Sequence, residues 1–93
     1  MKGYFYILLC SNGCYYSGST VDLERRWFQH KNGEGAAYTR RNPPIKLMYV
    51  EEFSRIDEAF AREKQVQGWS RKKKESLING RFHDLHELAR CRG

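Results

Sequence analysis

The chain of 93 residues is 40% hydrophobic and 14% aromatic, which favours one packed domain over residues 1–93 and excludes a disordered protein. No apolar run approaches the roughly 18 residues that cross a membrane, and the N-terminus lacks a secretory pattern, so we expect a cytoplasmic protein. The net charge of +6 predicts a polyanionic partner, nucleic acid rather than membrane, although many small basic proteins bind no specific ligand.

The chain begins with two predicted strands joined by a turn. Residues 4–10 form an aromatic and β-branched run that is apolar on both faces, which is typical of a central strand. Residues 11–13 read Ser-Asn-Gly and predict a turn, after which residues 14–19 return as a second strand. We therefore expect an antiparallel hairpin at the start of the domain.

The length of this turn decides whether two tyrosines share one face of the sheet. A two-residue Asn-Gly loop would pair Tyr16 with Leu9 and point Tyr6 to the face opposite Tyr16. A three-residue loop, with Gly13 in a left-handed bulge, pairs Tyr6 with Gly18 and puts both phenols on one face. The shorter loop is the commoner one for Asn-Gly, but we choose the longer because it alone lets both tyrosines serve one site.

The middle of the chain predicts a helix, a loop and a third strand. Asp22 is a favoured N-cap residue and starts a helix that runs to about Lys31, with Gly33 just beyond its end. Residues 32–44 are rich in glycine, proline and asparagine and predict a loop. Residues 45–53 form the third predicted strand.

Helices make up the second half of the predicted domain. Ser54 predicts the N-cap of a second helix, and Ser70 that of a third, basic helix ending near Gly80. Apolar spacing over about 82–91 indicates a short fourth helix. The order β-β-α-β-α-α-α predicts an α+β domain with a core over about 4–80 and a three-stranded, mainly antiparallel sheet flanked by helices.

Polar residues on the core faces of two helices are candidates for function. Glu63 falls in the middle of the apolar face of the second helix, where an ionised carboxylate is costly unless a cation or hydrogen-bond donors meet it. Its partner is therefore a divalent metal ion or, as a structural alternative, Arg26 or Arg62 in a buried ion pair. On the first helix, His30 lies in line with the core face and Arg26 one turn earlier, which favours a pair facing a cleft. A lone histidine against a core is more often a structural residue.

Several segments, in the same order along the chain, resemble a known family. Tyr4-Phe5-Tyr6, Tyr16-Ser17-Gly18 and residues 19–30 resemble the two signature motifs and the first helix of the GIY-YIG nucleases. Three further segments resemble the small stand-alone bacterial (UPF0213-like) subgroup of this family, namely residues 35–40, 58–65 and 69–71. The departures from the motifs, Tyr4-Phe5 for Gly-Ile and Ser17 for Ile, affect positions that supply no functional group in the family.

This resemblance implies that the protein hydrolyses DNA phosphodiester bonds at one Mg²⁺ or Mn²⁺ ion held by Glu63. Tyr6 would act as general base toward the attacking water, for which its phenol needs nearby positive charge. Arg26 would neutralise charge on the phosphate oxygens. Tyr16 would orient water or phosphate, and His30 would position a tyrosine or contact phosphate. Without the resemblance, both tyrosines would be interpreted as packing residues.

Basic and aromatic residues outside this group would bind the DNA backbone or an unpaired base. They are Tyr38, Arg40, Arg41, Arg71, Lys72, Lys73 and Lys74. Backbone contacts carry no sequence information, and a chain this short leaves little room for a second, target-reading domain. We therefore expect low sequence specificity or recognition of DNA structure, such as single-stranded or branched DNA. The lysine run equally fits a solvated helix face, and RNA as a substrate stays open.

Two alternatives use the same residues differently. A nucleic-acid-binding accessory module that kept the fold and lost catalysis would bind DNA or RNA without cleaving either. A small structural or ribosome-associated basic protein would show salt-sensitive RNA binding and no dependence on metal. Cleavage assays in Mg²⁺ or Mn²⁺ separate both alternatives from a nuclease.

Overall fold

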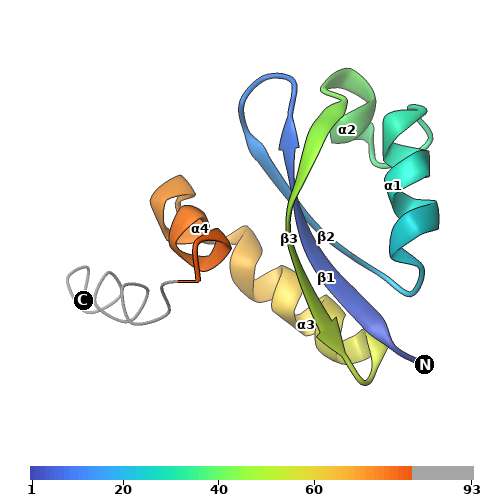
Figure 1. Ribbon diagram of the computed structural model, residues 1–93, viewed down its shortest axis with the longest axis vertical. Helices are drawn as coiled ribbons and strands as arrows, with labels where there is room; N and C mark the ends of the chain where they lie inside the picture. Colours follow the sequence, from blue (N-terminus) through green and yellow to red (C-terminus); the bar gives the residue numbers. More distant parts are fainter. Residues whose placement is uncertain (81–93) are drawn as a thin grey trace.

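The computed structural model describes residues 1–80 of the chain. The predicted fourth helix, over 82–91, lies outside these residues. The described elements, in chain order, are β1 (Gly3–Cys10), β2 (Tyr15–Thr20), α1 (Leu23–Lys31), α2 (Ala37–Arg41), β3 (Pro44–Phe53), α3 (Ile56–Gln67) and α4 (Arg71–Ile78). Figure 1 shows the strands as one twisted sheet with helices on both sides. The predicted α+β class is confirmed.

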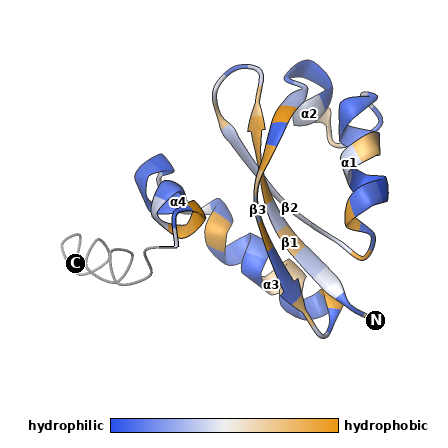
Figure 2. Ribbon diagram, viewed as in Figure 1, coloured by the Kyte–Doolittle hydropathy of each residue, from blue (hydrophilic) through white to orange (hydrophobic). Residues whose placement is uncertain are grey.

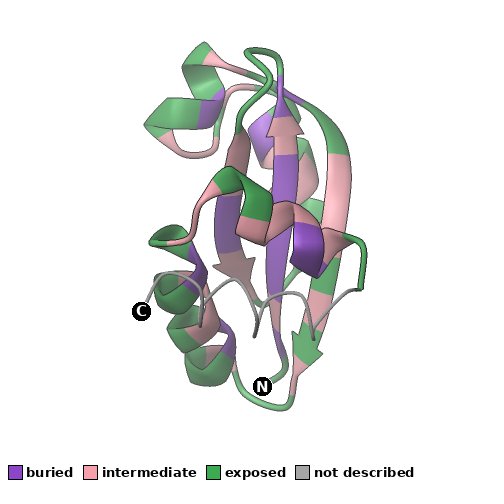
Figure 3. Ribbon diagram, turned by 90° about the vertical axis from the view of Figure 1, so that its left-hand side faces the viewer, coloured by how far each residue is buried: buried purple, intermediate pink, exposed green. Residues whose placement is uncertain are grey.

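The three strands form one antiparallel sheet in the order β2-β1-β3, so β1 is the central strand. A central strand in a three-layered domain is covered on both faces, which explains why β1 is apolar on both. Figure 3 shows that buried residues gather along this strand and on the sides of the helices that face it. The strand β2, by contrast, is an edge strand, so it pairs with β1 along one edge and with no strand of the described sheet along the other.

The hairpin between β1 and β2 has the longer of the two loops considered from the sequence. Tyr6 pairs with Gly18, and Leu8 pairs with Tyr16. Gly13 has a φ of 83°, in the left-handed region that glycine adopts at little cost. Because residues two apart in a strand point to the same face, Tyr6 and Tyr16 lie on one face of the sheet, as predicted.

The two faces of the sheet carry different helices (Figure 1). We call the face covered by α3 and α4 the α3 face, and the face covered by α1 and α2 the α1 face. On the α3 face, Phe5 and Ile7 of β1 pack with Val66 of α3 and Leu77 of α4, and all four are fully buried. Tyr6 lies on the α1 face because neighbouring residues of a strand alternate. Figure 2 shows that most residues of the helices are hydrophilic, with hydrophobic residues at intervals along them.

The short helix α2 lies within the predicted loop over 32–44, which corrects the predicted element order. The described elements follow the order β-β-α-α-β-α-α. α2 has five residues, and its N-cap residue, Ala36, makes no side-chain cap hydrogen bond. None of the sequence signals for a helix start is therefore present. The buried side chain of Thr39 shows that α2 is held by tertiary packing.

The other helices start close to the predicted positions. Asp22 accepts a hydrogen bond from the amide of Arg25 at 3.1 Å, and Ser70 accepts one from the amide of Lys73 at 3.2 Å. The helix α3 begins after the N-cap residue Arg55 instead of Ser54. None of the helices in the described part of the chain has the length and apolar character to span a membrane.

Candidate active site

Two phenols and one imidazole meet on the α1 face. The rings of Tyr6 and Tyr16 both contact the ring of His30 edge-on, with centroid distances of 5.8 and 5.4 Å. Tyr6 and His30 are almost completely buried, at 1% and 0% exposure, whereas Tyr16 on the edge strand is partly exposed. Three of the predicted catalytic residues are therefore in contact, and Tyr16 is the one nearest to solvent.

His30 is hydrogen-bonded through both of its ring nitrogens. Nε2 lies 2.8 Å from the hydroxyl of Tyr6, and Nδ1 lies 2.7 Å from the hydroxyl of Thr39 on α2. Burial, helped by the positive charge of Arg26, lowers the pKa of His30 from 6.5 to about 4, so the imidazole is neutral at physiological pH. A side chain at Gly35 would overlap the His30 ring, so the loop before α2 approaches the ring only because residue 35 is glycine.

Tyr6 is protonated at neutral pH. Burial raises the pKa of its hydroxyl from 10.0 to about 12, and the positive charge of Arg26 offsets only part of this effect. The hydroxyl lies against Gly18, its partner on β2, where any side chain would overlap it. A general base works best when its pKa lies near the operating pH. Tyr6 can therefore serve as a base only if another group takes its own proton.

Arg26 supplies the positive charge beside the site tyrosines, Tyr6 and Tyr16. Burial raises the pKa of both phenols, and the charge of Arg26 opposes that increase. The guanidinium donates a hydrogen bond to the side chain of Gln29 at 3.1 Å, and it takes part in none of the salt bridges of residues 1–80. A half-buried guanidinium without a carboxylate partner in this part of the chain suits a phosphate oxygen.

Glu63 approaches from the α3 face, where it contacts the edge strand β2. Its Oε1 accepts a hydrogen bond from Ser19 of β2 at 2.6 Å, and its Oε2 accepts one from Gln67 at 3.0 Å. Arg62, considered as its ion-pair partner, instead pairs with Glu51 at 3.0 Å, and the salt bridges of the described chain include none with Glu63. After burial, the negative charge of Glu63 is a further cause of the raised pKa of both site tyrosines. The carboxylate therefore lies near the phenols, across β2.

Two surface hollows lie along β2, next to the side chains of Arg26, Glu63 and Tyr16. One, of about 310 Å³, includes Ser19 and Arg26 in its lining. The other, of about 280 Å³, includes Tyr16 and Gln67. Because Ser19 and Gln67 are the two hydrogen-bond partners of Glu63, the carboxylate lies between the hollows. A phosphate backbone that follows β2 would meet a guanidinium, a carboxylate and a phenol in turn.

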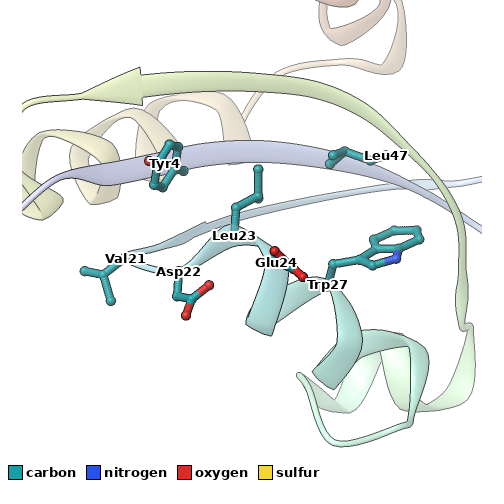
Figure 4. Close-up of a pocket in the computed structure, with 7 residues that line it drawn as sticks. All are labelled: Tyr4, Val21, Asp22, Leu23, Glu24, Trp27 and Leu47. Carbon is teal, nitrogen blue, oxygen red and sulfur yellow. The ribbon is translucent and has the colours of Figure 1, made fainter.

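A larger hollow, of about 670 Å³, lies between α1 and the sheet (Figure 4). Leu23 and Trp27 of α1 and Leu47 of β3 give it a mainly apolar lining. None of the predicted catalytic or metal-binding residues belongs to this lining. The size of a hollow therefore does not identify the candidate site in this fold.

The predicted nucleic-acid-binding residues of α2 lie beside the site. Tyr38 stacks on Tyr16, with a centroid distance of 5.9 Å and an interplanar angle of 14°, and its hydroxyl accepts a hydrogen bond from Asn12 at 2.9 Å. Arg40 and Arg41 are exposed at the end of the same helix. Tyr38 is therefore part of the wall of the site, and the two arginines extend the positive surface next to it.

The predicted basic residues of α4 differ in their relation to the site. Lys74 lines the same hollow as Tyr16, and burial lowers the pKa of its ammonium group. Arg71 and Lys73 instead lie over aromatic rings, at 4.7 and 4.6 Å from the ring centroids. Among the described residues, neither of these nor Lys72 lines either of the two hollows along β2. The structure therefore brings one of the four residues to the site.

Three polar residues of the site are absent from the sequence-based prediction. Gln67 is four residues after Glu63, so helical spacing alone could have found it. Ser19 pairs with Phe5 and so faces α3, which the hairpin register could have shown. Thr39 carries no such signal, because the sequence predicts a loop at its position.

The fold and this polar cluster together define a class of protein. It is an α+β domain whose three-stranded antiparallel sheet carries two motif tyrosines, on β1 and β2, near an arginine and a carboxylate. The family model of the GIY-YIG catalytic domain matches residues 2–76, so the chain belongs to the GIY-YIG family. This family is an endonuclease superfamily, and its domain implies a nucleic-acid substrate.

Small proteins of similar length are similar to this chain in sequence and in fold. The chain is 42% identical over 78 residues to a UPF0213 protein of Staphylococcus saprophyticus, a match that covers 84% of this chain and 95% of that protein. The solution NMR structure of a UPF0213 protein from Bacillus halodurans has 42% identity and a TM-score of 0.55, covering 85% of this chain and 84% of that chain. The solution NMR structure of a protein from E. faecalis has 40% identity and a TM-score of 0.59, with coverage of 89% and 88%. The resemblance to the small stand-alone subgroup is confirmed.

Proposed function

We propose that the protein is a metal-dependent endonuclease that hydrolyses DNA phosphodiester bonds with low sequence specificity or with a preference for DNA structure. The charge arrangement along β2 supports this proposal most directly. The cation of Arg26 and the anion of Glu63 both act on the two site tyrosines, and neither forms a salt bridge within residues 1–80. A phosphate and a divalent cation are the ligands that such a pair of side chains can accept together.

Glu63 suits a single hard cation such as Mg²⁺ or Mn²⁺. The described residues contain no group of three or more His, Cys, Asp and Glu that would enclose an ion. The hydrogen-bond partners of Glu63, Ser19 and Gln67, are neutral, so its negative charge is not compensated by them. Mg²⁺ is commonly held by one or two carboxylates together with waters and substrate phosphate. When bound, such an ion would stabilise negative charge on the phosphate and on the leaving oxygen.

In this proposal, the attacking water loses its proton to the tyrosine–histidine cluster. The water enters from the side of Tyr16, which is the more exposed phenol. Tyr6 accepts the proton on its hydroxyl oxygen while its own hydroxyl proton passes to Nε2 of His30, 2.8 Å away. No free phenolate is needed, so the raised pKa of Tyr6 does not block the step. The low pKa of His30 describes the protein without substrate, and the negative charge of a bound phosphate would raise it toward the range in which an imidazole accepts a proton. Arg26 binds a non-bridging phosphate oxygen, and solvent protonates the leaving oxygen.

A second candidate, a nucleic-acid-binding module that has lost catalysis, is favoured by one observation. Tyr6 is only 1% exposed, so its hydroxyl does not meet bulk solvent in the protein without substrate. Such a module would use the same basic surface to bind DNA or RNA and would cleave neither.

Cleavage of supercoiled, single-stranded and branched DNA, with RNA in parallel, tests the proposal in Mg²⁺ or Mn²⁺. We expect wild type to nick DNA and Arg26→Ala and Glu63→Ala to be slower by at least about 100-fold. Arg55→Ala and Glu52→Gln remove the same charges from exposed positions outside the site and should retain activity. Cleavage without metal, or cleavage that persists in Arg26→Ala and Glu63→Ala, overturns the proposal. Binding without cleavage supports the accessory module.

A further inference from the structure

We propose that Thr39 is a positioning residue for the tyrosine–histidine pair. Its hydroxyl oxygen accepts a hydrogen bond from Nδ1–H of His30, which leaves the lone pair on Nε2 free to accept the hydroxyl proton of Tyr6. The catalytic consequence of this arrangement rests on the proposed nuclease function. The arrangement of hydrogens itself does not, so the two can be tested separately.

The hydrogen bonds from Tyr6 to His30, from His30 to Thr39 and from Thr39 to Ala36 can all form at once when each group donates to the next. The Thr39 hydroxyl lies 3.0 Å from the carbonyl oxygen of Ala36, which can only accept. When the hydroxyl donates there, its oxygen must accept from Nδ1 of His30, 2.7 Å away. A neutral imidazole with its proton on Nδ1 has its lone pair on Nε2, so the hydroxyl of Tyr6 donates to it across 2.8 Å.

The opposite tautomer leaves a buried hydrogen without an acceptor. With its proton on Nε2, His30 would donate to the Tyr6 oxygen, and the hydroxyl hydrogen of Tyr6 would need another acceptor. Among the described residues, the Tyr6 hydroxyl is hydrogen-bonded to Nε2 of His30 and to the Arg26 side chain, and of these two only Nε2 can accept its hydrogen. Arg26, whose charge also acts on Tyr6, can only donate. Because a buried donor without a partner is costly, the Nδ1-protonated tautomer is favoured.

The fold keeps the Thr39 hydroxyl in place. Thr39 is fully buried, and its branched side chain has few rotamers available on a helix. The carbonyl of Ala36 also accepts from the amide of Arg40 at 3.0 Å, which ties it into the first turn of α2. Gly35 lets the preceding loop reach the imidazole ring. The short helix missed in the sequence is therefore the element that orients His30.

The same hydrogen bond gains strength during the proposed reaction. The O–H bond of Tyr6 breaks as an N–H bond forms at Nε2 of His30, and the Tyr6 oxygen takes a proton from the attacking water. His30 becomes an imidazolium, and its Nδ1–H still donates to Thr39. A charged donor forms a stronger hydrogen bond than a neutral one, so Thr39 stabilises His30 more after the transfer than before it.

NMR of protein labelled with ¹⁵N in its histidines tests the hydrogen arrangement without DNA. The ¹⁵N chemical shift of each ring nitrogen reports whether that nitrogen carries a proton. The chain has three histidines, so the spectrum of His30→Gln identifies the signals of His30. We expect His30 of the wild-type protein to be protonated at Nδ1 at neutral pH. Protonation at Nε2 would overturn the proposal.

Thr39→Val and Thr39→Ser separate the hydroxyl group from the shape of the side chain. Valine keeps the branched shape and removes the acceptor of Nδ1–H, so the two tautomers of His30 become comparable in free energy and both should be populated. We expect kcat for DNA cleavage to fall at least about ten-fold in Thr39→Val, with an unchanged Kd for DNA. Thr39→Ser keeps the hydroxyl and should retain the wild-type tautomer, with kcat within about three-fold of wild type.

Amide spectra show whether each variant is folded. If Thr39→Val does not fold, Thr39→Ala replaces it as the variant that lacks the hydroxyl. A folded variant without the hydroxyl that keeps the wild-type tautomer overturns the positioning role. So does a loss of kcat that serine fails to restore. If wild type has the Nδ1-protonated tautomer but cleaves no DNA, the nuclease proposal fails and the positioning role of Thr39 stands.

Discussion

The hydroxyl of Tyr6 lies 2.8 Å from Nε2 of His30, in the buried centre of the α1 face. The two residues are 24 positions apart and belong to the central strand and the first helix. This contact changes the interpretation of Tyr6 as a base. A phenol with a pKa of about 12 does not take a proton from water unaided, but it can do so when a neutral imidazole takes the hydroxyl proton in turn.

The protein should lose stability in mild acid because His30 is buried in its neutral form. Burial lowers the pKa of His30 from 6.5 in the unfolded chain to about 4 in the folded one, so the unfolded state binds more protons between these values. The free energy of unfolding should therefore fall by on the order of 2–3 kcal/mol as the pH falls from about 6.5 to about 4. Urea unfolding at several pH values measures this change. His30→Gln should lack this contribution, and an equal pH dependence in both proteins would contradict it.

Tyr6→Phe should retain the fold and lose cleavage, because it removes only the hydroxyl that exchanges protons with His30. We expect kcat to fall by about 10²–10⁴-fold in single-turnover cleavage of DNA. Tyr49→Phe removes a hydroxyl from a partly buried tyrosine on the α3 side of the sheet and is the matched control. Equal cleavage by the two variants would exclude Tyr6 from the reaction.

Gly18→Ala should disturb the site from β2, because the new methyl group would overlap the Tyr6 hydroxyl. The free energy of unfolding should fall by about 1–3 kcal/mol, which is typical of overpacking, and the Tyr6–His30 hydrogen bond should be displaced. Gly68→Ala is the control, since Gly68 has a φ of −82° and no neighbouring atom within 4 Å of the added carbon. Its stability should stay within about 0.5 kcal/mol of wild type. Similar losses in the two variants, followed by urea unfolding, would refute the close contact.

Lys74→Ala should weaken DNA binding more than Lys72→Ala, because only Lys74 lines the hollow that contains Tyr16. Each lost phosphate contact reduces the slope of log K against log salt by about 0.9 for duplex DNA. Fluorescence anisotropy at several salt concentrations measures this slope for both variants and for wild type. We expect the reduced slope in Lys74→Ala and a wild-type slope in Lys72→Ala. The reverse result would place the DNA on the opposite side of α4.

Much of the fold follows from short-range patterns in the sequence. The apolar run of β1, the cap residues Asp22 and Ser70, and the bulged turn at Gly13 all act on backbone within a few residues of themselves. The longer hairpin loop is predicted because one site needs both tyrosines on one face, and the observed pairing of Tyr6 with Gly18 confirms it. Local chemistry therefore predicts the hairpin, but the shared face of the phenols follows only from the requirement of one site, because Asn-Gly alone favours the shorter loop.

The partners of the site residues depend on longer-range packing. The sequence offers Arg26 or Arg62 to Glu63, but Glu63 contacts Ser19 and Gln67, and Arg62 pairs with Glu51. An ion pair forms only where two side chains of opposite charge meet in space. The spacing of residues along α3 does not show which side chains of β2 or β3 lie opposite them. The same limit applies to α2, because it has no side-chain cap and no apolar repeat from which the sequence could predict it.

The amino-acid sequence by itself determined the strands, the principal helices and the set of polar side chains that a hydrolytic site needs. Only the tertiary structure decided that the Tyr6 hydroxyl faces an imidazole held by Thr39 and that Glu63 reaches the phenols across β2. The physical reason is that caps and strand alternation act between near neighbours in the chain, whereas a pKa and a hydrogen-bond direction depend on burial and on groups that folding brings from far away.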